Sequence, residues 1–486
     1  MAIDVRRLEA GQVIDGFHLV EPLDPGGMAN FWRVTKPGLD LPMVMKIPLL
    51  RPGEDPITII GFEAEQMIMA RLTGPHVPRF VAAGDFESPY VVMEFIDGRP
   101  LRSLLPHMPC AAEEVAEIGI QVAFALDDLH RQNVLHLDVK PSNIILRPNG
   151  IAALIDYGLS HHTLLPDLIG EEIDGPVGTA PYVAPEQVLG DRFEPRSDIF
   201  ALGVVMYFLV TGERPFGDPQ RAPEWRHRLW RDPHPPRHWN KAVPPWLQEA
   251  ILRCLEVDPD ARYATAAQLA FDLKNPDQMV LTERARRLRR DGAMTVLLRR
   301  LASRRLKYVR RVRHQPALTR APIIAVAVDL SPQAEALDGP LRQAVMRVLA
   351  TEPAARLACV NVLKTARIGL DPMEDAQGRN PHLQRLVELR HWAHTLPIDP
   401  DRVTFHVLED TDPARALVEF GLNSRIDHIV MGARGSSTMR RFLGSVSAQV
   451  VAQARCTVTV VRAPQTGLAI GEPGALQLGT DSDLGG

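Results

Sequence analysis

The stretch VLHLDVKPSNIIL, residues 134–146, places three polar side chains between two apolar runs. These are Asp138, Lys140 and Asn143. Because the flanking runs predict short buried strands, the loop between them is held at both ends and can direct all three side chains into one site. A carboxylate that orients a hydroxyl, an ammonium that neutralises a phosphate oxygen and an amide oxygen that ligates Mg²⁺ are the groups that phosphoryl transfer requires.

Two further segments carry charges that fit the same chemistry. In ALIDYGL, residues 153–159, Asp156 ends an apolar strand and precedes a Tyr-Gly turn, where its carboxylate suits a hard cation such as Mg²⁺. Lys46 is the only charge in the apolar run MVMKIPL, residues 43–49. A lysine in a buried strand needs an anionic partner, and Glu65, in the next predicted helix, is the natural candidate.

The order of the predicted elements indicates the class of the first part of the chain. Residues 17–100 alternate short apolar runs with Gly/Pro turns, which predicts a small, mostly antiparallel sheet interrupted by a helix over residues 62–72. Later, apolar residues recur three and four positions apart, predicting helices over residues 111–132, 197–211 and 245–255. A β-rich lobe before a larger helical lobe is an α+β arrangement, and we expect a cleft between the two.

With these motifs in place, the segment from about residue 17 to 274 resembles the eukaryotic-like serine/threonine protein kinases. The motifs keep the family's order: a glycine-containing loop, the strand lysine, the helix glutamate, HxDxKxxN over 136–143, DxG over 156–158 and GTxxYxAPE over 178–186. The form DVKPSN is typical of the serine/threonine branch. The resemblance implies a bilobal kinase fold, ATP with Mg²⁺ (or Mn²⁺) as cofactors, and protein serine and threonine hydroxyls, its own included, as phosphate acceptors.

The same resemblance implies a role for each matching residue. Asp138 and Lys140 are expected to be catalytic, and Asn143 and Asp156 to hold the metal. In the family, Glu186 pairs with the arginine that matches Arg262. The residues expected to bind the nucleotide are Leu23, Gly26, Gly27, Lys46, Glu65, Met93, and the hinge residues Glu94 and Ile96.

Three positions depart from the family pattern, and the first two of them motivate a second hypothesis. The glycine-rich loop over residues 24–31 keeps only the middle glycine in register, Leu137 replaces the arginine that normally pairs with a phosphorylated activation loop, and Tyr157 replaces a phenylalanine. Fewer glycines bring fewer backbone amides close to the phosphates. The alternative is therefore a pseudokinase, a nucleotide-responsive signalling scaffold without phosphate transfer.

After Pro322 the pattern changes to β-rich runs separated by helical segments, which indicates βαβ units and a parallel sheet. Residues 321–463 resemble the universal stress protein family, a Rossmann-like α/β fold. The signals are AVAVDLS, with Asp329 at the end of the first strand, and the glycine-rich stretch that begins IVMGARGSS. Glycines after a strand, and a helix N-terminus, allow backbone amides to approach a phosphate.

Nucleotide binding and dimerisation both remain open for this second body. The residues expected to contact a nucleotide are Asp329, Gly432, Gly435, Gly444 and Ser445. ATP-binding members of the family carry G-x2-G-x9-G-[ST], whereas residues 432–445 are one residue shorter. The alternative is a module that forms a homodimer, in which the glycines serve only turns.

Charge is distributed unevenly along the chain. Residues 1–280 have a net charge of −14 and residues 321–486 of −2, whereas residues 281–320 hold 14 basic and 2 acidic residues, a net charge of +12. Apolar residues at helical spacing in this connector, from Leu288 to Val312, predict one or two basic amphipathic helices with one face packed on protein. We expect a charged linker, then docking on the acidic body, ahead of binding to lipid or nucleic acid.

Composition excludes several classes of protein. The 486 residues are 45% hydrophobic and 23% charged, which is typical of a globular chain. The longest apolar run, residues 199–210, is too short to cross a bilayer, and the N-terminus has no signal-peptide core. Four scattered cysteines form no CxxC pair, which excludes a zinc finger and suits a reducing compartment. We therefore expect a cytoplasmic protein, and the resemblance to protein kinases implies that its partners are ATP and protein substrates.

These observations predict five segments. They are an N-terminal extension over residues 1–16, a kinase domain over 17–276, a basic helical linker over 277–320, a universal stress protein-like domain over 321–463, and a disordered tail over 464–486.

Overall fold

The structure is a computed structural model. It describes residues 8–23, 29–49, 56–84, 89–173, 175–303, 306, 322–365, 381–399, 402–433 and 444–462. The predicted N-terminal extension lies partly outside these residues, and the predicted tail lies wholly outside them.

The first body begins with a six-stranded antiparallel sheet, in the strand order β1-β2-β3-β4-β6-β5. Its first strands have the alternating burial expected of a sheet that covers a core on one face. The bounds are β1 Val13–Ile14, β2 Phe17–Pro22, β3 Ala29–Lys36, β4 Leu39–Pro48, β5 Phe80–Ala83 and β6 Val91–Glu94. Helix α1 (Pro56–Met69) begins six residues earlier and ends three residues earlier than the sequence predicted.

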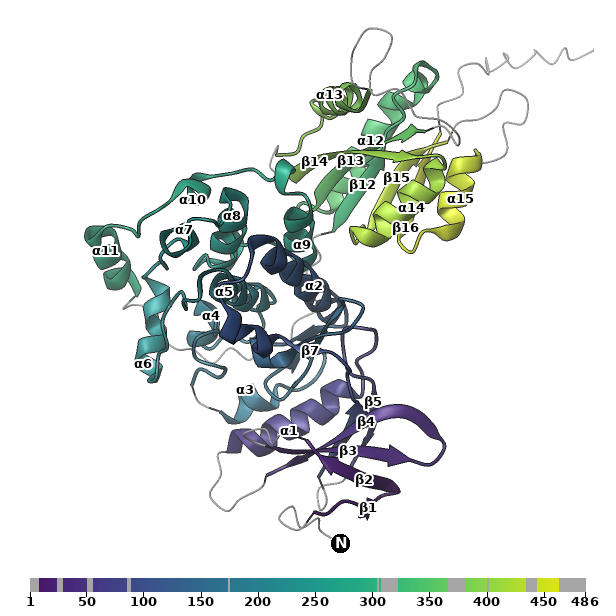
Figure 1. The fold of residues 1–486 in the computed structure, drawn as a ribbon. Helices are drawn as coiled ribbons and strands as arrows, with labels where there is room; N and C mark the ends of the chain where they lie inside the picture. Colours follow the sequence, from purple (N-terminus) through teal and green to yellow (C-terminus); the bar gives the residue numbers. More distant parts are fainter. Residues whose placement is uncertain are drawn as a thin grey trace, which may run out of the picture.

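A helical lobe follows the sheet, as predicted (Figure 1). Its long helices are α2 (Ala112–Arg131), α5 (Arg196–Thr211) and α8 (Pro245–Cys254), each within one residue of the predicted bounds. The other helices are α3 Leu168–Glu172, α4 Pro185–Val188, α6 Ala222–Trp225, α7 Pro236–Trp239 and α9 Ala266–Lys274. Short strands complete the lobe: β7 Arg99–Pro100, β8 Val134–Leu135, β9 Ile144–Leu146, β10 Ala152–Leu154 and β11 His161–His162.

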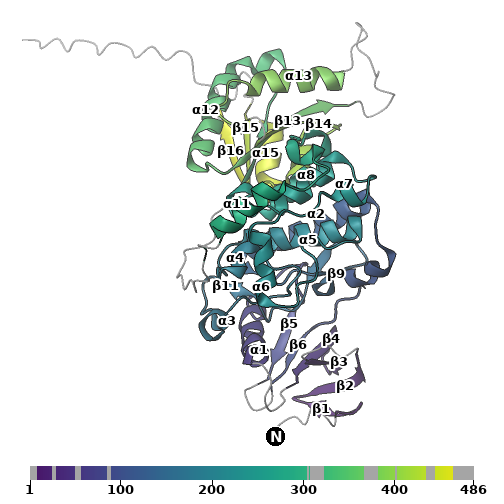
Figure 2. The ribbon, with the colours of Figure 1, turned by 90° about the vertical axis from the view of Figure 1, so that its left-hand side faces the viewer.

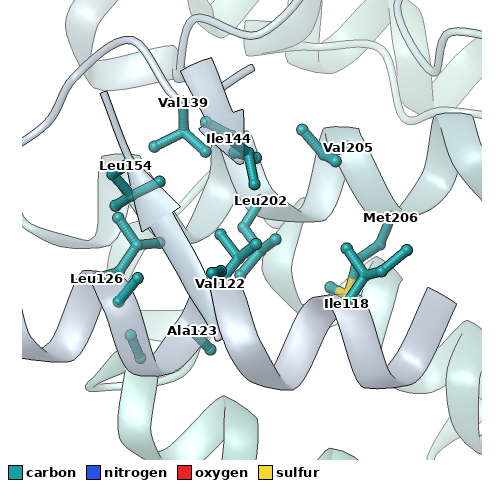
Figure 3. Packing of buried hydrophobic residues seen from close by; sticks show 14 of the residues in the cluster. Ile118, Val122, Ala123, Leu126, Val139, Ile144, Leu154, Leu202, Val205 and Met206 are labelled. Carbon is teal, nitrogen blue, oxygen red and sulfur yellow. The ribbon is translucent and has the colours of Figure 1, made fainter. Parts of the chain in front are cut away.

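The core of this lobe lies directly under the loop 136–143. Ile118, Val122 and Leu126 of α2 face Leu202 and Met206 of α5 (Figure 3). Val139 of the loop, Ile144 of β9 and Leu154 of β10 belong to the same cluster, and none of them is exposed to solvent. Because such cores are closely packed, the loop that carries Asp138 rests on a rigid base.

The C-terminal body is a five-stranded parallel sheet in the order β14-β13-β12-β15-β16. Helices cover both faces, so the predicted Rossmann-like α/β class is confirmed. Its strands are β12 Ile323–Ala327, β13 Arg356–Lys364, β14 Val403–Asp410, β15 His428–Gly432 and β16 Thr457–Val461. Its helices are α12 Glu335–Thr351, α13 Pro381–Ala393, α14 Pro413–Asn423 and α15 Ser445–Gln453.

The two bodies share a buried interface, which the sequence did not predict. Helix α9 of the first body places Ala267 and Phe271 in the same apolar cluster as Ile323 and Ala325 of β12. Ion pairs surround this contact: Arg356 pairs with Asp272, both almost fully buried, and Arg131 lies 2.7 Å from Asp427. Figure 1 places α9 beside the C-terminal sheet.

The connector contains two short helices, α10 (Glu283–Arg286) and α11 (Ala293–Ser303). Helix α11 is amphipathic, as predicted, but the expectation that its apolar face packs on protein is wrong. Leu298 and Leu301 are 61% and 46% exposed, because α11 contacts the first body through its polar side. Val309 and Val312 lie outside the described residues. Across the described part of the chain, no helix is long and apolar enough to span a membrane.

Candidate active site

Lys46 of β4 joins two segments that are distant in sequence. Its Nζ lies 2.6 Å from Oε2 of Glu65 on α1 and 3.0 Å from Oδ1 of Asp156, which follows β10. Lys46 and Glu65 are buried, at 9% and 1% exposure, whereas the Asp156 side chain is 45% exposed. The ion pair predicted between Lys46 and Glu65 is therefore confirmed, and the half-exposed carboxylate of Asp156 remains accessible to a ligand.

Lys46 and Asp156 stabilise each other's charged forms. Burial alone would lower the pKa of Lys46, but the carboxylates of Glu65 and Asp156 outweigh burial and raise its pKa above the usual range. In return, the Lys46 ammonium lowers the pKa of Asp156. At neutral pH the site thus presents a cation and an exposed anion side by side, which suits a phosphate oxygen and a metal ion respectively.

Asp138 is the acceptor at the centre of the loop between β8 and β9. Its carboxylate accepts hydrogen bonds from Lys140 Nζ (2.6 Å), Thr179 Oγ1 (2.6 Å), the Thr179 amide (3.1 Å) and Asn143 Nδ2 (3.2 Å). Lys140 Nζ also donates to Thr179 Oγ1 at 2.8 Å. The loop 136–143 and the segment before α4 are therefore tied together at Asp138, although they lie about 40 residues apart.

The backbone of the loop 136–143 is held in place by a buried carboxylate of α5. Asp198 of α5 is 1% exposed and accepts hydrogen bonds from the amides of His136 (2.9 Å) and Leu137 (2.7 Å). Leu137 has φ of +60°, a conformation that costs a non-glycine residue roughly 1–3 kcal/mol. The leucine that replaces the family's arginine therefore lies buried in a strained turn that Asp198 stabilises.

Asp156 has a similarly constrained backbone. Its φ is +67°, and the next residue, Tyr157, is fully buried. The Tyr157 hydroxyl donates to the Leu154 carbonyl at 2.9 Å, so the extra oxygen relative to phenylalanine is satisfied inside the core. This anchoring holds the Asp156 carboxylate beside Lys46.

Asn143 is the remaining polar residue of the loop. Its Nδ2 donates to the backbone carbonyl of Asp138 at 3.0 Å, and its Oδ1 accepts from Ser142 Oγ at 3.2 Å. Among the described residues, no group of three or more His, Cys, Asp or Glu could hold a metal ion. The oxygen donors of Asn143 and Asp156 nevertheless fit Mg²⁺, which is held by one or two protein ligands together with phosphate oxygens and water.

The structure describes only some of the residues expected to contact the adenine base and the phosphates of ATP. Met93 and Ile96 are buried beside the sheet, and the Glu94 amide donates to the Arg79 carbonyl at 2.8 Å. The Leu23 amide donates to the Phe31 carbonyl at 2.8 Å, which closes the strand pair before the glycine loop. Gly26 and Gly27 of that loop lie outside the described residues.

Sequence reasoning missed one arginine that shapes the site. Arg228 is 1% exposed and donates to the carbonyl of Ala180 at 2.7 Å and to that of Val183. It thereby holds the segment that presents Thr179 to Asp138. No signal near Arg228 in the sequence indicates this role, because it is one of several arginines in a proline-rich stretch.

In the C-terminal body, the predicted nucleotide contacts gather at the carboxyl edge of the sheet. Asp329 follows β12 and Gly432 ends β15, the two strands between which the strand order reverses. Gly444 precedes α15, which begins at Ser445, and Gly435 lies outside the described residues. A Cβ at Gly432 would come within 3.0 Å of Leu337, so close helix packing also favours glycine there.

The first body has two lobes, a lysine paired with two carboxylates, and a loop whose backbone is held by Asp198. These features are those of a protein kinase. The model of the protein kinase domain family matches residues 40–272, and that of the universal stress protein family matches residues 322–462. The chain therefore contains a protein kinase domain followed by a universal stress protein family domain.

Relatives among curated proteins include bacterial serine/threonine kinases. Serine/threonine-protein kinase PknB of Mycolicibacterium smegmatis is 32% identical over 266 residues, which cover 53% of this chain and 42% of that protein. A probable serine/threonine-protein kinase of Clostridium perfringens is 30% identical over 261 residues, covering 53% of this chain and 38% of that protein. The chain thus spans less than half the length of these relatives. The crystal structure of the Mycobacterium tuberculosis PknI kinase domain aligns with a TM-score of 0.44 and 23% identity, covering 56% of this chain and 100% of that chain.

Proposed function

We propose that this protein is a serine/threonine protein kinase that transfers the γ-phosphate of ATP to protein hydroxyls, its own included. The observation that carries the proposal is the contact of Lys46 Nζ with both Glu65 and Asp156. The three charges come from different segments, and a half-exposed carboxylate beside an ammonium group suits an anionic ligand bound with a metal ion. The similarity to bacterial serine/threonine kinases supports the same reaction.

Each group has a part in the transfer. Lys46 binds phosphate oxygens of ATP, and Glu65 keeps its ammonium in place. Asp156 and Asn143 would hold Mg²⁺, or Mn²⁺ in its place, and the metal would neutralise charge on the phosphates. Asp138 orients the acceptor hydroxyl and takes its proton, while Lys140 contributes positive charge beside it. Positioning and electrostatics therefore supply most of the rate enhancement.

The C-terminal domain is proposed to sense a nucleotide or stress signal, or to form a homodimer. The gathering of Asp329, Gly432 and Gly444 at one sheet edge supports a nucleotide site, with Gly435 and Ser445 as further contacts. We also propose a cytoplasmic location, which is supported by the four free cysteines. Protein substrates and ATP are the expected partners, and nucleic acid is not.

Transfer of label from γ-labelled ATP to the full chain tests the proposal. We expect incorporation with Mg²⁺ and none after chelation by EDTA, because the triphosphate cannot bind productively without its cation. The variant Asn143→Ala should need Mg²⁺ at a concentration higher by about tenfold or more for half-maximal rate, since it loses a metal ligand.

The matched control is Asn149→Ala, at an exposed turn outside the site. Its Mg²⁺ titration should coincide with that of the unchanged protein. Incorporation that persists in EDTA, or equal titrations for Asn143→Ala and the unchanged protein, would contradict the assigned metal site.

A further inference from the structure

Helix α11 presents its large apolar side chains to solvent. Met294, Leu297, Leu298 and Leu301 are 68%, 48%, 61% and 46% exposed. They lie three, one and three positions apart, which places them in one stripe along the helix. Eight of the 17 large apolar side chains that are exposed in the described chain lie within residues 280–306. An amphipathic helix of a globular protein normally turns such a stripe toward the core.

The opposite side of α11 fixes this orientation. Arg299 Nη1 lies 2.9 Å from both Asp232 and Asp291, and Ser303, at 4% exposure, has its carbonyl within reach of Arg226. Positions 299 and 303 are one helical turn apart and face away from the apolar stripe. Figure 1 places α11 at the outer margin of the helical lobe, and in Figure 2, where α11 faces the viewer, no described element covers it.

Positive charge accompanies the exposed stripe. Arg286, Arg289 and Arg300 are exposed, and residues 281–320 together have a net charge of +12. Leucine and methionine on one side and arginine nearby are the composition of helices that lie in the interface of an anionic bilayer. The 11 residues of α11 span roughly 16 Å, about half the hydrocarbon thickness, so this helix can lie on a membrane but not cross it.

The same features argue against other occupants. A second copy docked stripe to stripe would bring two strongly positive segments together, and their repulsion disfavours that pairing. The negative charge of nucleic acid would complement the positive charge of the connector, but the stripe has no aromatic side chain on which a base could stack. An anionic lipid bilayer complements both the positive charge of the connector and the aliphatic side chains of the stripe.

We propose that α11 is a docking helix for an anionic membrane surface, which its exposed leucines and Met294 enter while the surrounding arginines contact lipid headgroups. The kinase domain is then held at the membrane through this surface, without a spanning segment in α11. This inference is independent of the phosphate-transfer reaction, since it depends only on the connector.

Flotation of the full chain with vesicles tests the proposal. We expect the protein to float with vesicles of phosphatidylcholine and phosphatidylserine, and to be released as salt is raised, because the attraction is partly electrostatic. Leu298→Glu should lower the partition coefficient by about tenfold or more, since it puts a charge in place of an exposed leucine that would enter the bilayer. Val387→Glu is the matched control, because Val387 on α13 is similarly exposed, at 66% against 61%, and the partition coefficient of this variant should be unchanged.

Several outcomes would overturn the inference. Flotation that is absent at low salt, that is equal with pure phosphatidylcholine, or that falls equally in the two variants would each do so. Sedimentation that shows a dimer dissociated by Leu298→Glu, with no vesicle binding, would instead assign the stripe to a second copy. Both variants alter exposed positions, so their unfolding temperatures should match that of the unchanged chain.

Discussion

Replacing Asp138 by asparagine is expected to lower the rate of phosphate transfer by about 10²- to 10⁴-fold, the usual contribution of a positioned acid or base. Asparagine has nearly the same shape and can still accept hydrogen bonds from Thr179, which lies 2.6 Å away. It has no negative charge, however, and cannot take the proton of an attacking hydroxyl. Initial rates of label transfer to a generic basic protein would measure the loss.

The affinity for Mg²⁺-ATP separates this chemical effect from a structural one. Lys46, Glu65 and Asp156 are unchanged in Asp138→Asn, so nucleotide binding measured by calorimetry should stay close to that of the unchanged chain. Asp40→Asn, at an exposed position of β4, serves as a control for the substitution itself. Rates that stay equal in Asp138→Asn and Asp40→Asn would refute the role assigned to Asp138.

Replacing Arg262 by alanine is expected to lower the free energy of unfolding of the kinase domain by about 3–5 kcal/mol, the cost of leaving one buried charge without its partner. The Arg262 guanidinium is fully buried and pairs with both oxygens of Glu186, at 2.7 and 2.8 Å. It also donates to the carbonyls of Arg196 and Glu256, at 2.9 and 2.8 Å. Its removal therefore leaves the Glu186 carboxylate buried, with the Ser197 hydroxyl as its remaining side-chain donor among the described residues.

Urea unfolding followed by the fluorescence of tryptophan in the kinase domain measures this loss. Arg415→Ala removes a pair of similar length, 2.7 Å, that is exposed to water on the other domain, and should leave the kinase transition unchanged. Arg262→Lys keeps the charge but not the bidentate geometry, and should fall between the two. A midpoint for Arg262→Ala equal to that of Arg415→Ala would show that the pair has no structural role.

The class of both domains could be predicted from the sequence. For the first domain, the reason is that phosphate transfer requires particular charged residues at particular positions. A lysine among apolar residues and an aspartate at the end of an apolar strand are unusual placements. The lysine is explained by the buried Glu65 carboxylate, which pairs with the Lys46 ammonium. The three long helices of the large lobe, α2, α5 and α8, were predicted to within one residue because their apolar residues recur at helical spacing.

Other features could not be predicted because they depend on which surfaces meet. Ala267 and Phe271 read as ordinary core residues of α9, and nothing in the sequence indicates that they cover the sheet of the second domain. The apolar positions of α11 predicted a buried face, but ion pairs of Arg299 with Asp232 and Asp291 turn the helix the other way. The left-handed backbone of Leu137 likewise reflects two hydrogen bonds to the distant Asp198.

Intact-mass spectrometry of the chain incubated with Mg²⁺-ATP, compared with Lys46→Arg, tests the central claim most directly. Arginine keeps a cation beside Glu65 and Asp156, so the fold should persist, but its planar guanidinium cannot occupy the position of the Lys46 ammonium. We predict that phosphate is added to the unchanged chain and is absent from the variant. Unmodified mass for both proteins, in spite of bound nucleotide, would contradict phosphate transfer and favour a nucleotide-responsive scaffold.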